Sequence, residues 1–182
     1  DLIRAVAMLR DRGREVIVQV AGDGPTLEGD RRLAQKLGVM DRIEWLGMIH
    51  EDLPRRYREA TLLAAPCTLA SFGVILIEAL ASGTAVVCAD NIGFRQVIRD
   101  GMPGRFVPMR DPAGLAAGIE EIVDQPQLRR EWATRGRELT RERYDWSGVA
   151  RQVSDLYREV LSEKRKDSEV TGKMTPEGIF AR

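Results

Sequence analysis

One apolar stretch, residues 70–81, constrains the fold of this chain more than any other part of its sequence. Every residue from 74 to 81 is apolar except Glu78. Because the stretch has no hydrophilic stripe, it predicts a helix that is buried on all sides. Ser71 is a candidate N-cap for this helix, and Gly83 is a candidate stop signal.

The lone carboxylate of Glu78 is the anomaly in this predicted helix. An ionised glutamate that is buried without partners is strongly unfavourable, and glutamate is rarely found fully inside a protein. Two interpretations follow. Either Glu78 forms an internal ion pair with a basic residue, or it points into a cleft where hydroxyl groups donate hydrogen bonds to it.

The start of the same helix is a candidate phosphate site. The first turn of a helix carries unpaired N–H groups and the positive end of the helix dipole, and Gly73 allows close approach to the backbone. Glu78 lies six residues after Phe72, which corresponds to ~9 Å along a helix axis. This spacing favours a diphosphate at the helix start with a ribose beside Glu78, and a plain core helix is the alternative.

These residues resemble the donor-binding signature of the retaining glycosyltransferases of family 4, which have the GT-B fold. The chain is similar in particular to the branch of mannosyltransferases that builds phosphatidylinositol mannosides. The resemblance extends over nearly all of the chain up to about residue 162. The motifs that carry it are Ser71-Phe72-Gly73, the apolar run after them, Glu78-Ala79, Gly83-Thr84-Ala85-Val86-Val87, Asp100-Gly101 and Gly104.

One position departs from the family pattern. Family members have a pair of glutamates at a fixed spacing, and the second of them falls on Glu78. The first falls on Ala70, which is not a carboxylate, although in the family this position is catalytic and contacts the donor sugar. An altered donor preference, a non-catalytic relative that binds a nucleotide or a partner, and an error in the sequence all remain open explanations.

The resemblance implies the C-terminal, donor-binding half of a two-domain enzyme. Such an enzyme transfers a hexose, here with mannose as the first candidate, from a nucleotide-diphospho-sugar to a lipid or glycan acceptor with retention. Glu78 would accept hydrogen bonds from the ribose. The residues implied to face the diphosphate and the sugar are Ser71, Phe72, Gly73, Val74 and Ile75.

The resemblance also implies the surroundings of the enzyme. It implies neither a cofactor nor a metal ion, and an N-terminal acceptor domain that is absent from these residues. The expected setting is cell-envelope glycan synthesis in the cytoplasm, with peripheral association to the inner face of the membrane through the acceptor domain. We expect the chain by itself to be inactive as a transferase.

Two further segments are candidate donor contacts. The predicted strand 15–21 ends in a turn with Gly22 and Gly24, and open α/β sheets bind ligands at the carboxyl ends of parallel strands. An ordinary strand-to-helix turn is the alternative there. The predicted strand 43–46 leads to Met48 and Ile49, which the resemblance places around the nucleobase. The single histidine that follows them, His50, is predicted to lie at the surface.

The order of the predicted elements defines the fold class. Five short strands alternate with helices, which predicts an α/β fold with a doubly wound, mostly parallel sheet, the Rossmann-like half of a GT-B enzyme. A helix over residues 1–12 comes first, so we expect the strand that precedes it in the family to be missing. Residues 1–162 form the predicted domain, and residues 163–182 are predicted to be a disordered tail. The predicted strands are 15–21, 43–46, 62–65, 85–89 and 105–107.

Composition excludes two classes of function. The chain has 28 basic and 28 acidic residues, so it lacks the positive charge of a nucleic-acid-binding protein. No apolar run approaches the ~20 residues that a membrane-spanning helix requires. Cys67 and Cys88 each end an apolar run and are predicted to be buried free thiols in a reducing compartment.

Overall fold

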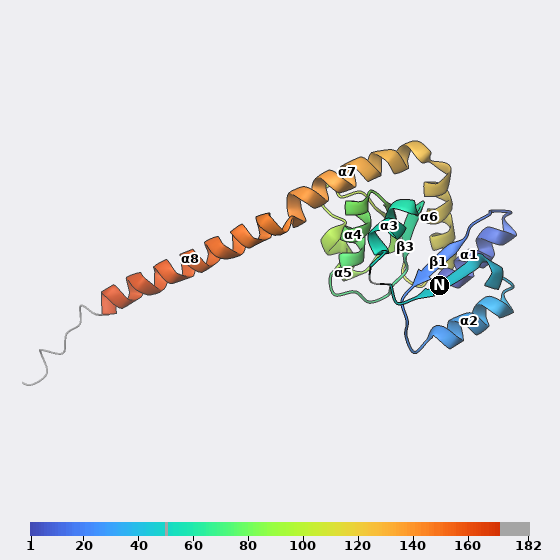
Figure 1. Cartoon of the computed structure of the whole chain (residues 1–182), viewed down its shortest axis with the longest axis horizontal. Helices are drawn as coiled ribbons and strands as arrows, with labels where there is room; N and C mark the ends of the chain where they lie inside the picture. The colour runs from blue at the N-terminus through green and yellow to red at the C-terminus, as the bar shows by residue number, and fades with distance from the viewer. Residues whose placement is uncertain (50, 172–182) are drawn as a thin grey trace, which may run out of the picture. The chain divides into compact units, whose positions relative to one another are not determined.

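The computed structural model describes residues 1–49 and 51–171, with side chains described up to residue 164. The chain divides into two compact units, Asp1–Thr140 and Arg141–Arg182. The first unit has an α/β fold, and its strands and helices alternate along the chain (Figure 1). The expected fold class is therefore confirmed.

The strands of the first unit form two parallel sheets. In one sheet β1 pairs with β2, with Val18 opposite Ile43. In the other sheet the order is β3-β4-β5, with Leu62 opposite Ala85 and Val87 opposite Arg105. Among the described residues the five strands thus form two separate parallel sheets, where the sequence predicted one. The strands are β1 (Val18–Ala21), β2 (Ile43–Gly47), β3 (Leu62–Ala65), β4 (Ala85–Ala89) and β5 (Arg105–Val107).

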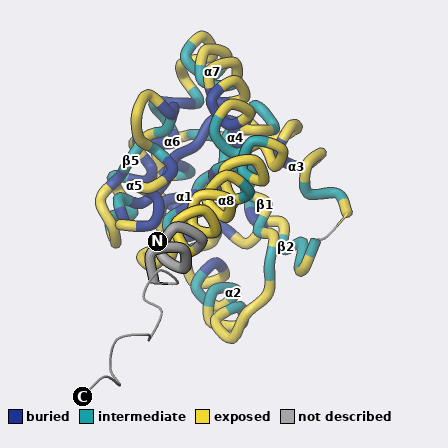
Figure 2. The backbone as a smooth tube through the Cα atoms, turned by 90° about the vertical axis from the view of Figure 1, so that its left-hand side faces the viewer, coloured by how far each residue is buried: buried dark blue, intermediate teal, exposed yellow. Residues whose placement is uncertain are grey.

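Helices connect the strands and cover both faces of the sheet β3-β4-β5. Strand β4 is buried along its whole length, and its alternate residues point to opposite faces. Val87 packs with residues of α1 and α6, and Val86 points to the other face, where α4 contacts the sheet. Figure 2 shows this buried centre of the first unit in dark blue. The helices are α1 (Leu2–Asp11), α2 (Leu27–Lys36), the 3₁₀ turn η1 (Met40–Arg42), α3 (Leu53–Glu59), α4 (Val74–Ser82), α5 (Ile92–Val97), α6 (Pro112–Asp124), α7 (Pro126–Tyr144) and α8 (Trp146–Thr171).

The sequence predicted most element bounds closely, because local signals set them. The bounds of β3, β4 and β5 are as predicted. Helix α4 ends before Gly83, whose φ of 80° is the left-handed stop that glycine allows. Helix α6 begins at Pro112 after Asp111, whose carboxylate accepts a hydrogen bond from the N–H of Gly114 at 2.9 Å.

The start of α4 differs from the prediction. The helix begins at Val74, and its N-cap is Gly73 with φ of 117°, so the prediction that Ser71 caps it was wrong. A Cβ atom on Gly73 would lie 2.7 Å from Cδ1 of Phe94. This position requires glycine for two reasons: its φ is unfavourable for residues with a side chain, and the Phe94 ring occupies the space that a side chain would need.

The burial of α4 is also one-sided. Leu76 and Leu80 are fully buried, but Val74 is 56% exposed and Ile75 is 38% exposed. The prediction of burial on all sides was therefore wrong for the first turn, and also for Ala81 near the end of the helix, which is exposed. The reason is that α4 starts at the carboxyl edge of the sheet, where its first turn has no strand behind it.

The two cysteines also differ in exposure. Cys88 on β4 is buried as predicted, whereas Cys67 is exposed, and the prediction was wrong for it. Cys67 follows Pro66, which has no N–H group to extend the strand pairing of β3. The chain leaves the sheet at this point.

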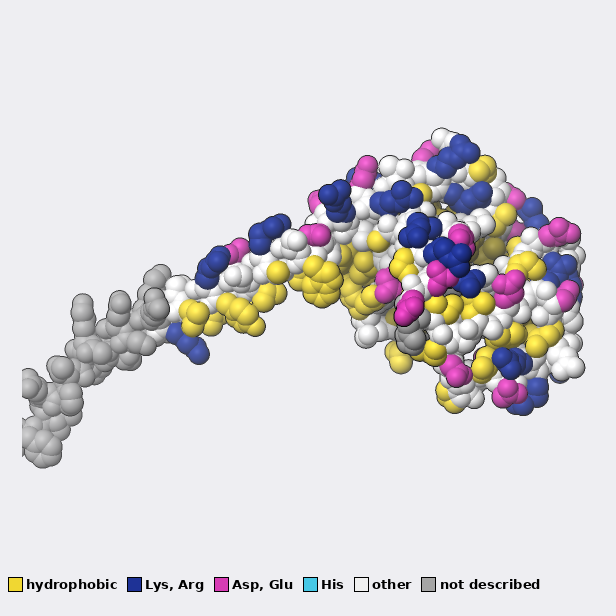
Figure 3. Space-filling model, viewed as in Figure 1, with side chains coloured by type: hydrophobic (Ala, Val, Ile, Leu, Met, Phe, Trp, Pro, Cys, Tyr) yellow, Lys and Arg dark blue, Asp and Glu magenta, His cyan; other side chains and the backbone are white. Residues whose placement is uncertain are grey.

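The second unit is built mainly from α8. The carboxylate of Asp145 accepts hydrogen bonds from the N–H groups of Ser147 at 3.1 Å and Gly148 at 3.3 Å, which caps this helix. Apolar side chains gather along one side of α8 (Figure 3), as its period predicted. Among the described residues, no helix has the length and apolar character needed to cross a membrane.

The end of α8 differs from the predicted domain boundary. Residues 163–171 are helical rather than without structure, because this segment contains neither glycine nor proline and consists mostly of good helix formers. Residues 172–182 of the predicted tail lie outside the described residues.

We predict that Gly93→Ala destabilises the protein. A Cβ atom on this glycine would lie 2.0 Å from the carbonyl oxygen of Ala70, so the backbone would have to move. We expect a loss of about 1–3 kcal/mol in the free energy of unfolding, measured by urea denaturation followed by circular dichroism. Gly29→Ala is the matched control, because Gly29 lies in α2 with open space around it, and its replacement should stabilise by up to about 1 kcal/mol. Equal stability of Gly93→Ala and the parent protein would contradict the prediction.

Candidate functional site

The candidate site lies at the carboxyl edge of the sheet β3-β4-β5, where the loop of residues 66–73 joins β3 to α4. Buried Asn91 holds this loop. Its side-chain amide donates a hydrogen bond to the carbonyl oxygen of Cys67 at 2.8 Å, and its Oδ1 accepts one from the N–H of Phe94 at 2.9 Å. Asn91 therefore caps α5 and ties the loop to it.

The backbone of the loop also packs directly against α5. The carbonyl of Ala70 and the N–H of Phe72 lie within 3.0 Å of the position that a Cβ atom on Gly93 would take. Ala70 is half-buried, and its methyl group offers no polar atom to a ligand. The backbone at Ala70, where the sequence resemblance implies a glutamate, is thus held in place by α5, and this chain carries no carboxylate there.

The first turn of α4 is open to an anionic ligand. No side chain of the described residues caps it, and the first capping bond, from the N–H of Leu76 to the carbonyl of Gly73 at 2.9 Å, comes from the backbone. Val74 and Ile75 are the first residues of this turn and are exposed. Their N–H groups belong to the positive end of the helix dipole, which favours a phosphate or a carboxylate.

Glu78 lies closer to this turn than the sequence predicted. It is four residues after Val74, where α4 begins, which corresponds to ~6 Å along the axis rather than ~9 Å. Its half-buried carboxylate accepts a hydrogen bond from the hydroxyl of Tyr57, with 3.1 Å between Oη and Oε2. Among the described side chains no ion pair to Glu78 occurs, and its hydrogen-bond partner is the neutral hydroxyl of Tyr57. That Glu78 also receives hydroxyl groups of a ligand stays a prediction.

Tyr57 stays a hydrogen-bond donor over the whole physiological range. Burial raises the pKa of its hydroxyl, and the negative charge of Glu78 and the hydrogen bond to it raise the pKa further. A tyrosine that is held neutral in this way keeps its proton directed at the carboxylate. No local pattern in the sequence indicates this pair, because the two residues are 21 positions apart on different helices.

The other predicted donor contacts form a second group at the ends of β1 and β2. The N–H of Gly22 donates to the carbonyl of Gly47 at 2.7 Å, which joins the two strand ends. Gly24 is exposed in the turn after β1. Met48 is 62% exposed beyond β2, and Ile49 is partly buried. His50 lies outside the described residues.

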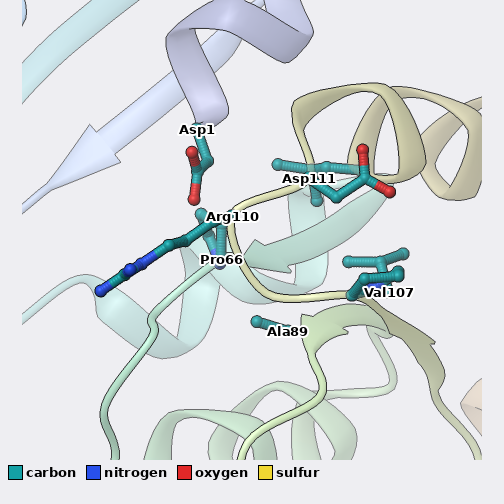
Figure 4. Close-up of a pocket in the computed structure, with 8 residues that line it drawn as sticks. Asp1, Pro66, Ala89, Val107, Arg110 and Asp111 are labelled. Atoms are coloured by element: carbon teal, nitrogen blue, oxygen red, sulfur yellow. The ribbon is translucent and has the colours of Figure 1, made fainter.

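Sequence reasoning missed a basic residue at the same edge as the loop 66–73. Arg110 follows β5, has φ of 58° and is exposed. It lines a shallow pocket with Asp1 and Pro66, and Figure 4 shows these three residues beside one another. Arg110 precedes the N-cap of α6 in the sequence, and no local pattern indicates that it lies beside Pro66 at the carboxyl ends of the strands.

Comparison with known proteins gives a consistent result at the level of sequence. A sequence model of the family described as "Glycosyl transferases group 1" matches residues 1–139. The chain is 35% identical over 161 residues to the phosphatidyl-myo-inositol mannosyltransferase of Mycolicibacterium smegmatis, a match that covers 87% of this chain and 41% of the relative. It is 34% identical over 175 residues to the D-inositol 3-phosphate glycosyltransferase of Salinispora tropica, with 90% of this chain and 36% of the relative covered. The chain thus spans about two fifths of the length of the curated relatives it matches.

Solved structures share the fold. A structure of HepE from Anabaena in complex with UDP superimposes with a TM-score of 0.77 at 23% identity, covering 87% of this chain and 44% of that protein. Sucrose-phosphate synthase from Thermosynechococcus elongatus superimposes with a TM-score of 0.76 at 25% identity, covering 89% of this chain and 43% of that protein.

We predict that the two thiols react with an aromatic disulfide reagent at very different rates. Burial, followed by the charge of Asp90, raises the pKa of Cys88 to about 12, so this thiol stays protonated and enclosed at neutral pH. Exposed Cys67 should react at once in the native protein, and Cys88 only after urea is added. In Cys67→Ser the fast phase should vanish. Rapid native reaction of both thiols in the parent protein would contradict the described burial.

Proposed function

This chain belongs to the group 1 glycosyl transferases, and we propose that it is the part of such an enzyme that binds the nucleotide-sugar donor. One observation carries the proposal. Helix α4 presents an uncapped, exposed first turn, and Glu78 follows one turn later with a hydroxyl partner instead of a cation. An anion site and a hydroxyl-binding carboxylate at this spacing suit a nucleoside diphosphate.

In the proposed complex, the N–H groups at the start of α4 bind the diphosphate. Phe72, Gly73, Val74 and Ile75 lie around this position, with Ser71 at its edge. Glu78 accepts hydrogen bonds from the ribose hydroxyls. The HepE structure, which shares the fold, contains UDP, and this supports a nucleotide as the ligand proposed for this chain.

We assign binding of the nucleobase to the second group of residues, at the ends of β1 and β2. The turn with Gly22 and Gly24, together with Met48 and Ile49, follows β1 and β2, whose ends are joined by the bond between Gly22 and Gly47. An exposed methionine and a partly buried isoleucine offer apolar surface on which a base can lie. Because apolar contact does not distinguish one base from another, hydrogen bonds from backbone groups would determine which base binds.

The proposed reaction is hexosyl transfer with retention, from the nucleotide-diphospho-sugar to a lipid or glycan acceptor. The bond between the anomeric carbon and the diphosphate oxygen breaks, and negative charge grows on the leaving diphosphate. The dipoles of α4 point at this charge and stabilise it, without a requirement for a metal ion. The mannosyltransferase relatives favour mannose as the sugar. The acceptor, and any membrane association, are assigned to the part of the enzyme that this chain does not span.

Ala70 favours a second candidate, a relative that binds the nucleotide without transferring the sugar. A hydrogen bond to a charged group contributes about 1.5–3 kcal/mol, so a missing carboxylate here lowers transfer by about tenfold to a hundredfold. Such a loss weakens an enzyme without removing its nucleotide site. We therefore retain transfer as the first candidate.

We predict that the natural full-length protein binds one of UDP, GDP and ADP more tightly than the other two. Glu78→Ala should weaken that binding by about tenfold or more, because it removes the acceptor for the ribose hydroxyls. Isothermal titration calorimetry measures the affinities, and a chelator should leave them unchanged. Glu28→Ala is the control, since Glu28 lies exposed on α2. A folded protein that binds none of the three nucleotides would refute the donor site.

We predict that Ala70→Glu raises the rate of sugar transfer by about tenfold to a hundredfold, because it adds a carboxylate that can bind the donor sugar. The assay uses the full-length protein with the nucleotide-sugar that matches the bound nucleotide. Ala70→Gln controls for side-chain size. A protein that transfers sugar only with Ala70→Glu would favour the non-catalytic relative, and rapid transfer with alanine would exclude it.

A further inference from the structure

Tyr57 is the residue whose position most needs an explanation in this site. It lies on α3, is 9% exposed, and places its hydroxyl oxygen 3.1 Å from Oε2 of Glu78 on α4. Glu78 is the one acidic residue in the apolar run of α4. The half-buried carboxylate thus has a neutral donor where an internal ion pair would have a cation.

The backbone of Tyr57 is fixed to the same helix that carries Glu78. The hydroxyl of Thr84 donates a hydrogen bond to the carbonyl oxygen of Tyr57. Thr84 itself is buried, and its N–H donates to the carbonyl of Ala79 at 2.9 Å, which closes the last turn of α4. Tyr57 is therefore held to the end of α4 through its backbone and to the middle of α4 through its hydroxyl.

This double attachment restricts the carboxylate. A glutamate side chain has several rotatable bonds, whereas a tyrosine ring with a fixed backbone has few. The hydrogen bond therefore holds Oε2 in one place. Within the described residues Oε1 has no hydrogen-bond partner, so it is the oxygen that a ligand can use.

We propose that Tyr57 is a positioning residue for the ribose of the donor nucleotide: its hydroxyl binds one oxygen of Glu78 and turns the other toward the ribose hydroxyls. The inference rests on the proposed function, because it assigns the ribose to Glu78. It adds a second residue, from another helix, to the recognition of the 2′- and 3′-hydroxyl groups. The positioning role can be distinguished from a purely structural role of Tyr57. A structural role would affect the binding of every ligand equally, whereas the positioning role affects only ligands that carry ribose hydroxyls.

The test compares two ligands with four proteins. The ligands are the ribonucleoside diphosphate that binds most tightly among UDP, GDP and ADP, and its 2′,3′-dideoxy form. The proteins are the full-length parent, Tyr57→Phe, Glu78→Ala and the double variant, each checked by thermal melting before calorimetry. Tyr57→Phe removes a single oxygen atom and keeps the ring, so the fold should persist.

We expect Tyr57→Phe to weaken binding of the ribonucleotide by about threefold to tenfold and to leave the dideoxy nucleotide nearly unchanged. In the double variant, the change at Tyr57 should add nothing to the loss from Glu78→Ala, because both act through one carboxylate. Tyr157→Phe, which alters an exposed tyrosine of α8, is the matched control and should change neither affinity.

Each other outcome has a distinct meaning. Equal weakening of both ligands by Tyr57→Phe, or no weakening of either, would overturn the positioning role while Glu78 keeps its own. If Glu78→Ala leaves both affinities unchanged, the assignment of the ribose to Glu78 fails, and the proposed function fails with it.

Discussion

The geometry of the site depends on one close approach, between the backbone of the loop 66–73 and the first turn of α5. The carbonyl of Ala70 lies where a side chain on Gly93 would be, and Asn91 binds the carbonyl of Cys67 from the same turn. These two contacts fix the loop, and the loop sets the direction in which α4 begins. The open first turn of α4 and the position of Glu78 both follow from this start.

Arginine side chains stabilise the C-terminal ends of helices in the first unit. Arg10 donates to the carbonyl of Gly38 at 2.8 Å, just beyond α2, and Arg129 donates to the carbonyl of Ile122 at 2.7 Å, in the last turn of α6. Cations at helix C-termini interact favourably with the helix dipole. Arg14 pairs with Asp124, at the end of α6, and this hydrogen bond raises the pKa of Arg14. These three arginines thus stabilise the fold.

The proposed donor site requires two different things of α4: one face must be buried in the core, and the first turn must be open to a ligand. Its buried face, with Leu76 and Leu80, anchors the helix in the core, whereas its first turn exposes Val74 and Ile75. An exposed apolar turn is unfavourable for a domain alone and suits a turn that a ligand covers. Glu78 lies between the two regions. The hydrogen bond from Tyr57 satisfies one of its carboxylate oxygens, and burial of the carboxylate without any partner would be unfavourable.

The sequence by itself determined the alternation of strands and helices, the end of α4 at Gly83, the cap at Asp111, and the presence of a single carboxylate, Glu78, in an otherwise apolar helix. These features depend on residues near one another in the chain, through hydrophobic period, turn residues and caps. Only the tertiary structure decided that Gly73 starts α4, that Cys67 is exposed, that Arg110 lies at the strand ends, and that Tyr57 binds Glu78. Each of these depends on the packing of segments that are distant in the chain, such as Phe94 against Gly73. Such contacts form only after the strands pair and bring these segments together, so the local conformational preferences of the residues do not predict them.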